Sequence, residues 1–327
     1  MSLIQFIFIV VALLFGFLNG FHDSANVAAT AITSKSVSPR LALGMTALAN
    51  LVGPFLFGVA VATTIGSEII TEPAMTIPVA MAGLVSAITW NLVTWLLGIP
   101  SSSSHALFGG FIGAAIAGFG VGVIQINGLF KILTALFISP LLGSGFGWLA
   151  MKLVLRSVRD QGPSVNNVFL RGQWLTAAVL GLSTGALEAQ KTMGILTLGL
   201  VAFGMLAEFH IPLWVVAASA GAMALGTIAG GWRLIRTVGA GFYRVRPVHA
   251  FASQLASTGV ILVATLLGGP VSTTQVISST IIGVGVAERL KMVRWGVARQ
   301  IASAWLLTLP ATGLLGGIGY WFLHRFW

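Results

Sequence analysis

Ionisable and amide side chains interrupt the first apolar segment of the chain. The stretch GFHDSAN, residues 20–26, follows an almost purely apolar run and contains His22, Asp23 and Asn26. Burying a carboxylate in hydrocarbon is costly, so such a group usually has a partner or a function. Within an apolar segment these side chains are typical of an ion or proton site, and a histidine there suits a proton path.

A second stretch repeats this arrangement in weaker form. GALEAQK, residues 185–191, aligns with residues 20–26, so that Glu188 matches Asp23 and Lys191 matches Asn26. Of the seven acidic residues, only Asp23 and Glu188 fall inside apolar segments. We therefore expect both to carry cation or proton coupling. The alternative is a structural pair of Glu188 with Lys191 one helical turn away, but that leaves Asp23 unexplained.

Lys191 bears on the charge of this site. A bound anion beside two carboxylates would leave a large negative charge in a medium of low dielectric constant, and cations, protons or a fixed ammonium must offset it. The hypothesis is that Lys191 does so permanently, in place of one coupling cation.

Two further stretches are rich in hydroxyl groups and also repeat. GIPSSSSHALFGGFIGAA, residues 98–115, aligns without a gap with GGPVSTTQVISSTIIGVG, residues 268–285. Proline fits the first turn of a helix, and serine and threonine there cap the helix or bind a ligand. Because a helix N-terminus offers free N–H groups and a positive dipole end, two such ends could converge on one oxyanion. Ordinary capping is the alternative, and the duplication favours binding.

Composition identifies the elements that must position these groups. The chain has 327 residues, of which 57% are hydrophobic and 7% charged, and its mean hydropathy is +0.98. A soluble domain has about 25% charged residues, so we predict an all-α polytopic membrane protein without a second, soluble domain. The net charge of +10 lies in short loops, which argues against a nucleic acid partner. The chain has no cysteine, which excludes disulfides and thiolate metal sites. It also has no Walker A motif, so direct use of a nucleotide is not expected.

The apolar pattern predicts ten crossings, each near the length of about 20 residues that a bilayer requires. They are residues 3–30, 41–65, 77–97, 104–120, 128–151, 174–205, 212–231, 249–267, 274–287 and 300–323. The first and sixth are long and interrupted. Four basic loops follow the first, fifth, seventh and ninth segments, whereas the loops GSEIITEPAMT and AEFHIP contain no Lys or Arg. The positive-inside rule therefore places the basic loops in the cytoplasm and both termini outside, with Lys131 as the main exception.

The repeated motifs divide the chain into two halves. We predict a first repeat over 1–151, a cytoplasmic linker over 152–173 and a second repeat over 174–327. Each half holds five crossings, so the second half enters the membrane in the opposite sense. The expected fold is two inverted-topology repeats with broken helices, about 10–12 transmembrane elements in all, and a binding site at the midplane.

The chain resembles the PiT family of inorganic phosphate transporters along almost its whole length. GFHDSAN, PSSSSHALFGG, AQKTMGI and GGPVSTT carry the resemblance, as does the tail VRWGVARQIASAWLLTLPA. It implies secondary transport of phosphate across the cytoplasmic membrane, coupled to protons or sodium, by a homodimer. In the bacterial members that it resembles, the cargo can be a neutral metal–phosphate complex.

The resemblance also implies roles for particular residues. It puts phosphate on hydroxyl residues of the two Pro-Ser motifs, namely Ser101, Ser102, Ser104, Ser272, Thr273 and Thr274. It puts cation or proton coupling on Asp23, Asn26, Glu188 and Gln190, to which the charge arguments add His22 and Lys191.

The second half departs from the family pattern. Thr184 stands where the family usually has His, Leu187 where it has Asn, Glu188 where it has Asp and Gln275 where it has His. An amide and two titratable groups are thereby lost. The departures bear on the coupling ion more than on the anion.

Three other functions are open to such a chain. One is transport of another tetrahedral oxyanion such as sulfate. Another is an anion channel or a non-transporting receptor, and a channel needs no coupling site. An enzyme is not expected, because it would need a nucleophile–base pair. Ser104 and His105, the one candidate, are adjacent on a helix and point apart.

Overall fold

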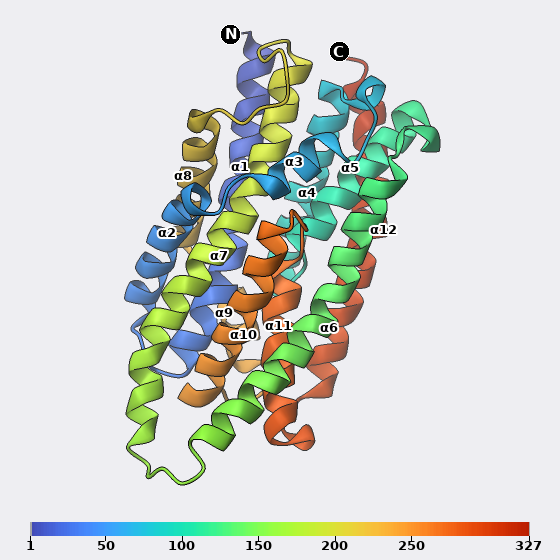
Figure 1. Ribbon diagram of the computed structural model, residues 1–327. Coiled ribbons are helices and arrows are strands. Elements are labelled where there is room, and N and C mark those ends of the chain that lie inside the picture. Colours follow the sequence, from blue (N-terminus) through green and yellow to red (C-terminus); the bar gives the residue numbers. More distant parts are fainter. Residues whose placement is uncertain (1, 327) are drawn as a thin grey trace.

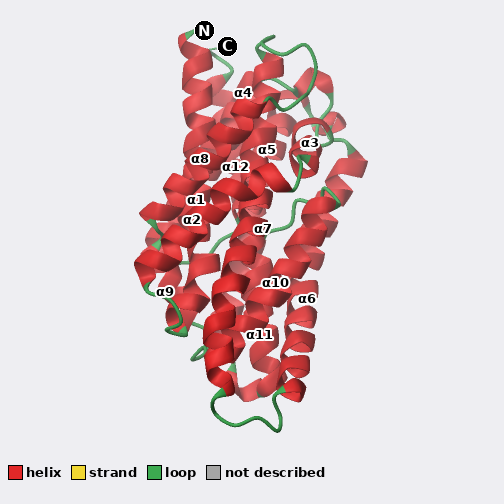
Figure 2. Cartoon of the chain, turned by 60° about the vertical axis from the view of Figure 1, so that its left-hand side comes forward, coloured by secondary structure: helices red, strands yellow, loops and turns green. Residues whose placement is uncertain are grey.

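Twelve α-helices form the protein over residues 2–326, which a computed structural model describes (Figure 1). Their bounds are α1 Leu3–Thr33, α2 Pro39–Leu56, α3 Ala60–Ser67, α4 Ile77–Leu97, α5 Ser103–Phe119, α6 Ile126–Ser157, α7 Val165–Ala202, α8 Leu213–Ala229, α9 Trp232–Ala240, α10 Pro247–Leu266, α11 Thr273–Glu288 and α12 Trp295–Leu323. Only short 3₁₀ turns and loops join them (Figure 2). The predicted all-α class is confirmed.

Several helices are long and apolar enough to cross a bilayer. Five helices, α1, α4, α6, α10 and α12, pass that test, and the pairs α2–α3 and α8–α9 each pass it as one broken span. Each pair is bent by 76°. Gly58 lies in the first break with φ +74° and Gly230 in the second with φ +69°, a backbone region that glycine enters without a Cβ penalty.

The elements occur in the same order in α1–α6 and in α7–α12: a long helix, a bent pair, two helices joined by a Pro-Ser segment, and a long helix. The two sets interlock, since α5 packs on α12 and α11 packs on α6. Gly113 and Gly283 permit this contact. A Cβ there would lie 2.0 Å from the Gly313 oxygen and 2.1 Å from the Ser144 oxygen. Within the predicted linker, α6 continues to Ser157 and α7 begins at Val165, so only residues 158–164 are non-helical.

The helices on either side of each Pro-Ser segment form a hairpin. The α4–α5 hairpin comes from the end that holds both termini, and the α10–α11 hairpin comes from the opposite end (Figure 1). The prediction that 104–120 and 274–287 each cross alone is wrong. With 17 and 16 residues, α5 and α11 are shorter than the bilayer requires, and they begin in the middle of the molecule.

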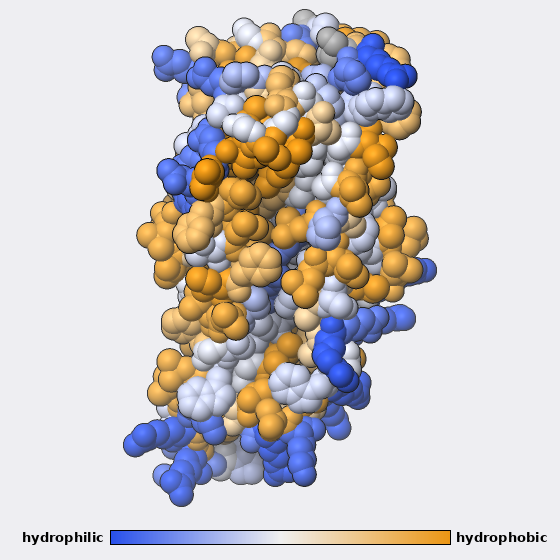
Figure 3. Space-filling view, turned by 90° about the vertical axis from the view of Figure 1, so that its right-hand side faces the viewer, coloured by the Kyte–Doolittle hydropathy of each residue, from blue (hydrophilic) through white to orange (hydrophobic). Residues whose placement is uncertain are grey.

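The two ends of the molecule differ in charge. Both termini lie at one end, which we call the termini end, and the four basic loops lie at the other, the basic end (Figure 1). Hydrophobic side chains cover the middle of the face in Figure 3, with hydrophilic ones above and below. Lys131, the main exception among the basic residues, pairs with Glu68 at 3.0 Å near the termini end. This local partner explains its place.

Candidate functional site

The N-termini of α5 and α11 meet in the middle of the molecule, between α1 and α7. Both helices are capped in the same way. The Ser102 hydroxyl accepts from the His105 amide at 3.2 Å, and the Ser272 hydroxyl accepts from the Gln275 amide at 3.3 Å. The other first-turn N–H groups of a helix have no intrahelical acceptor. Two positive helix ends thus face one buried space.

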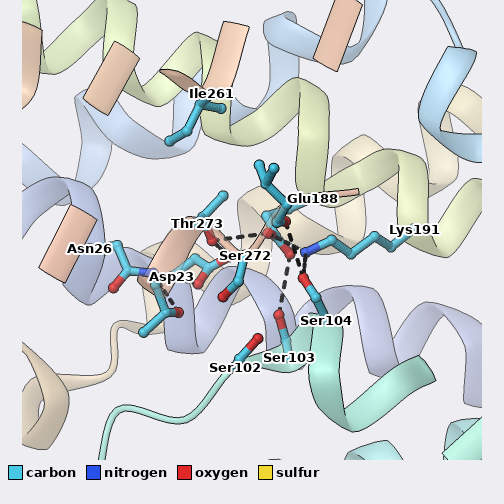
Figure 4. A network of polar contacts seen from close by, with 12 residues as sticks. Asp23, Asn26, Ser102, Ser103, Ser104, Glu188, Lys191, Ile261, Ser272 and Thr273 are labelled. Carbon is cyan, nitrogen blue, oxygen red and sulfur yellow. Dashed lines mark hydrogen bonds and ion pairs between the residues drawn. The ribbon is translucent and has the colours of Figure 1, made fainter. Parts of the chain in front are cut away.

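Two carboxylates lie beside these helix ends (Figure 4). Asp23 of α1 is 1% exposed and Glu188 of α7 is 0% exposed. The Thr273 hydroxyl joins them, at 2.9 Å from Glu188 Oε1 and 3.3 Å from Asp23 Oδ2. Ser103 donates to Glu188 Oε2 at 3.3 Å. Residues from four helices therefore form one polar network, as the two motif pairs predict.

Lys191 and Asn26 complete the network from matching positions. Lys191, which is fully buried, donates to Glu188 and to the Ser104 hydroxyl, the latter at 2.6 Å. Asn26 donates to Asp23 Oδ1 at 2.7 Å and to the Thr274 hydroxyl at 3.0 Å. The ammonium of Lys191 contacts Glu188, whereas Asp23 is paired with the neutral amide of Asn26. At full ionisation, these four side chains carry a net charge of −1.

The remaining predicted residues lie around this centre. The Ser101 hydroxyl pairs with that of Thr94 at 2.7 Å. His22 Nε2 lies 2.8 Å from the Asn91 carbonyl oxygen, and His105 Nδ1 lies 2.7 Å from the Ser102 hydroxyl.

Gln190 points to α3 and away from the carboxylates. Its Oε1 atom accepts from the amides of Val61 at 2.8 Å and Ala62 at 3.3 Å. Gln190 thus caps the N-terminus of α3. Its contacts place it behind the network rather than within it.

Ser103 was not among the predicted binding residues, yet it contacts Glu188. The sequence did contain a signal. In the gapless alignment of the Pro-Ser motifs Ser103 matches Thr273, which contacts the same carboxylate. A residue predicted to bind in one repeat therefore also points to its aligned residue in the other repeat.

Comparison with known proteins agrees with this geometry. A family model described as "Phosphate transporter family" matches residues 19–164 and 157–316. A Mycobacterium leprae protein named "Probable low-affinity inorganic phosphate transporter" is 43% identical over 322 residues, which are 97% of this chain and 78% of that protein. A Bacillus subtilis protein of the same name is 40% identical over 326 residues, 98% of each chain.

A solved structure gives the fold independently. It is described as "The sodium-dependent phosphate transporter", superposes with a TM-score of 0.91 at 22% identity, and covers 100% of both chains. At that identity the likeness supports the architecture alone. Together with the family match and the two relatives, the interlocked repeats confirm the resemblance. The chain belongs to the phosphate transporter family and is a membrane transporter rather than an enzyme.

Proposed function

We propose that this protein is a secondary active transporter that moves inorganic phosphate through the cytoplasmic membrane together with protons. One observation carries the proposal: two hydroxyl-rich helix N-termini, from hairpins that enter from opposite ends, meet at two buried carboxylates. A helix N-terminus suits an oxyanion, and buried carboxylates suit a cation or a proton.

Phosphate would bind between the two helix ends. The proposed contacts are the hydroxyls of Ser101, Ser102, Ser104, Ser272, Thr273 and Thr274, with Ser103 added from the structure. The carboxylates favour phosphate over sulfate. Phosphate at neutral pH retains a proton and can donate a hydrogen bond to the ionised member of the pair Asp23 and Glu188, whereas sulfate is fully ionised and has no proton to donate.

The charge of the network supports coupling to a cation. Asp23, Glu188 and Lys191 together carry −1 when ionised, and a phosphate ion adds at least one further negative charge. In a medium of low dielectric constant that charge must be offset before the loaded site can move. We propose a proton on Asp23 or Glu188 as the offset.

The other predicted coupling residues would act around these acids. His22 lies one residue before Asp23 and would relay the proton, because contact of Nε2 with the Asn91 carbonyl leaves Nδ1 free to accept. Gln190 would act indirectly, through α3. Sodium at Asp23 and Asn26 is the rival coupling ion, and the sodium dependence named for the structural neighbour favours it.

Orientation, repeat organisation and assembly complete the proposal. The basic loops would face the cytoplasm and both termini the outside, by the positive-inside rule. The working unit would be a homodimer, each chain made of repeats 1–151 and 174–327 joined by 152–173. The cargo would be phosphate itself or its neutral complex with a divalent metal.

Uptake of radiolabelled phosphate into proteoliposomes tests the proposal. A pH gradient without sodium is expected to drive uptake, and excess unlabelled sulfate is expected not to compete. Uptake that needs a sodium gradient would identify sodium, rather than the proton, as the coupling ion. A requirement for added magnesium would identify the metal–phosphate complex as the cargo. Competition by sulfate would favour the broader oxyanion transporter.

A channel predicts a different result. Channel flux needs no coupling site, so the double variant Asp23→Asn, Glu188→Gln would retain phosphate flux. We expect this variant to lose gradient-driven uptake. Retained flux down a phosphate gradient that does not saturate with phosphate and does not respond to pH or sodium would establish a channel.

A further inference from the structure

Two threonines hold the tips of the two hairpins. The Thr64 hydroxyl of α3 donates to the Gly268 carbonyl at 3.0 Å, and the Thr237 hydroxyl of α9 donates to the Gly98 carbonyl at 3.0 Å. Gly98 and Gly268 each stand at the turn of a hairpin with φ +68°. The contacts are equivalent under the repeat, since α3 and α9 are the second members of the two bent pairs.

The helices that bear these threonines are themselves anchored to the opposite half. Gln190 of α7 accepts from the first amides of α3, and Ser24 of α1 accepts from the Gly231 amide ahead of α9 at 2.8 Å. Glu188 lies two residues before Gln190, and Asp23 lies one residue before Ser24. Each carboxylate is therefore linked through a cap, a short helix and a threonine to the tip of one hairpin.

Each short helix also borders a cavity at one end of the molecule. A cavity of about 550 Å³ is lined by Gly66 and Ser67 of α3 and by Glu72 and Glu208. A cavity of about 250 Å³ near the basic end is lined by Gly98, Thr237 and residues of α12. The network of carboxylates and hydroxyls is buried from both. Thr237 and Gly98 line the second cavity themselves, and Thr64 lies one helical turn from Ser67, which lines the first, so each threonine contact lies next to one of these cavities.

We infer that Thr64 and Thr237 are a matched pair of latches, each of which closes the central site toward one end of the molecule. Both latches are closed in this structure, so the site is occluded from both ends. Release of Thr64 from Gly268 frees the α10–α11 tip and opens the termini end. Release of Thr237 from Gly98 frees the α4–α5 tip and opens the basic end. The inference rests on the proposed transport function, because only a transporter needs the two ends to open in turn.

The absence of cysteine from the chain permits a direct test. A single cysteine reporter, Ser272→Cys, is placed at the site and is modified by a charged methanethiosulfonate in right-side-out and inside-out membrane vesicles. Thr64→Val removes one latch hydroxyl, which also accepts from Lys131 at 2.8 Å. Loss of its bond to Gly268 alone is expected to raise the rate of modification from the termini end by roughly two- to ten-fold. Thr237→Val is expected to do the same from the basic end. The repeat-related reporter Ser102→Cys should give the same pattern.

Matched controls separate a latch from a general loss of structure. Thr63→Val is the control on α3, because the exposed Thr63 hydroxyl donates to the carbonyl of Val59, the N-cap residue of the same helix, and does not reach the opposite half. Thr64→Ser and Thr237→Ser keep the hydroxyl and should restore slow modification. Faster modification from both ends in either variant, or no change with either reporter, overturns the inference.

The two proposals fail separately. Cysteine modification can be measured without a substrate. End-specific modification in a protein that takes up no phosphate would support the latches and contradict phosphate as the substrate. Phosphate uptake with unchanged rates of cysteine modification would support the transport function and contradict the latches.

Discussion

Asp23 in α1 and Glu188 in α7 hold matching places in the two halves, but their neighbours differ. Asp23 is accompanied by the neutral amide of Asn26 and follows His22, which contacts the backbone of Asn91. Glu188 is accompanied by the ammonium of Lys191 and follows Leu187. The same positions are thus polar and uncharged in one half, and apolar with a fixed cation in the other.

The difference suggests that the two halves contribute differently to the charge balance of the site. The second half carries its cation covalently, so the charge of Glu188 is offset in every state. The first half has no such charge beside Asp23, and in the proposed mechanism an exchangeable proton or sodium ion would supply it there. The resemblance to the family places Asn at the position of Leu187 and His at that of Thr184, and the absence of those groups here agrees with this view, because they would serve a mobile ion. We therefore expect coupling to depend chiefly on the first half.

The largest effect is expected from Lys191→Gln. It leaves Glu188 buried without its cation, which typically costs about 3–5 kcal/mol. Thermal unfolding should show the loss of stability, and phosphate uptake should stop or require an added cation. The neutral double variant Glu188→Gln, Lys191→Gln should recover much of the stability. Unchanged uptake by Lys191→Gln would end the idea of a fixed cation.

Asp23→Asn is expected to affect coupling more than stability. The amide can still pair with Asn26 and Thr273, so the free energy of unfolding should fall by only about 1 kcal/mol. Uptake driven by an ion gradient should nevertheless be lost, while exchange of phosphate across the membrane continues. Measurement of both fluxes in proteoliposomes distinguishes them. Full gradient-driven uptake by this variant would mean that the coupling ion binds in the second half.

Thr273→Val and Ser103→Ala should differ although the residues are equivalent in the repeat. Thr273 contacts both carboxylates, whereas Ser103 contacts Glu188 alone. The single Thr273 proton serves one carboxylate at a time, and its contact with Glu188 at 2.9 Å is shorter than that of Ser103 at 3.3 Å. Because a lost hydrogen bond costs about 1 kcal/mol, Thr273→Val should raise the KM for phosphate more than Ser103→Ala. Initial rates of uptake over a range of phosphate concentrations give both values. Equal effects would mean that the link to Asp23 contributes nothing to binding.

The smallest effect is expected at the edges of the two short helices. Lys131 at the α3 end contacts both Thr64 and Glu68, whereas Arg233 at the α9 end donates to the Leu96 carbonyl and needs no carboxylate. Because the Lys131–Glu68 pair is partly exposed, Glu68→Gln should cost no more than about 1 kcal/mol. Its effect should shrink at high salt. Unfolding curves at low and high ionic strength test this, and a salt-independent loss would mean that Glu68 acts by packing.

Much of the site could be predicted from the chain. Asp23 and Glu188 are conspicuous because they are the acids inside apolar segments, and the two Pro-Ser motifs are conspicuous because they recur without a gap. The repeat also brings out Ser103 once Thr273 is recognised. The place of Gln190 could not be predicted, because capping of α3 depends on a contact between residues more than a hundred positions apart along the chain.

Apolar length, hydroxyl motifs and the sign of loop charges are local properties, and they were enough to determine the class of protein, its two halves and its buried polar residues. Hydrophobic burial in a membrane needs only a sufficient run of apolar residues. Where those runs stop is decided by tertiary structure. The hairpins turn because α5 and α11 can bury their polar first turns only against each other and against α1 and α7. The contacts of Thr64 and Thr237 likewise exist only once both halves have packed, since each hydroxyl meets a carbonyl in the opposite half.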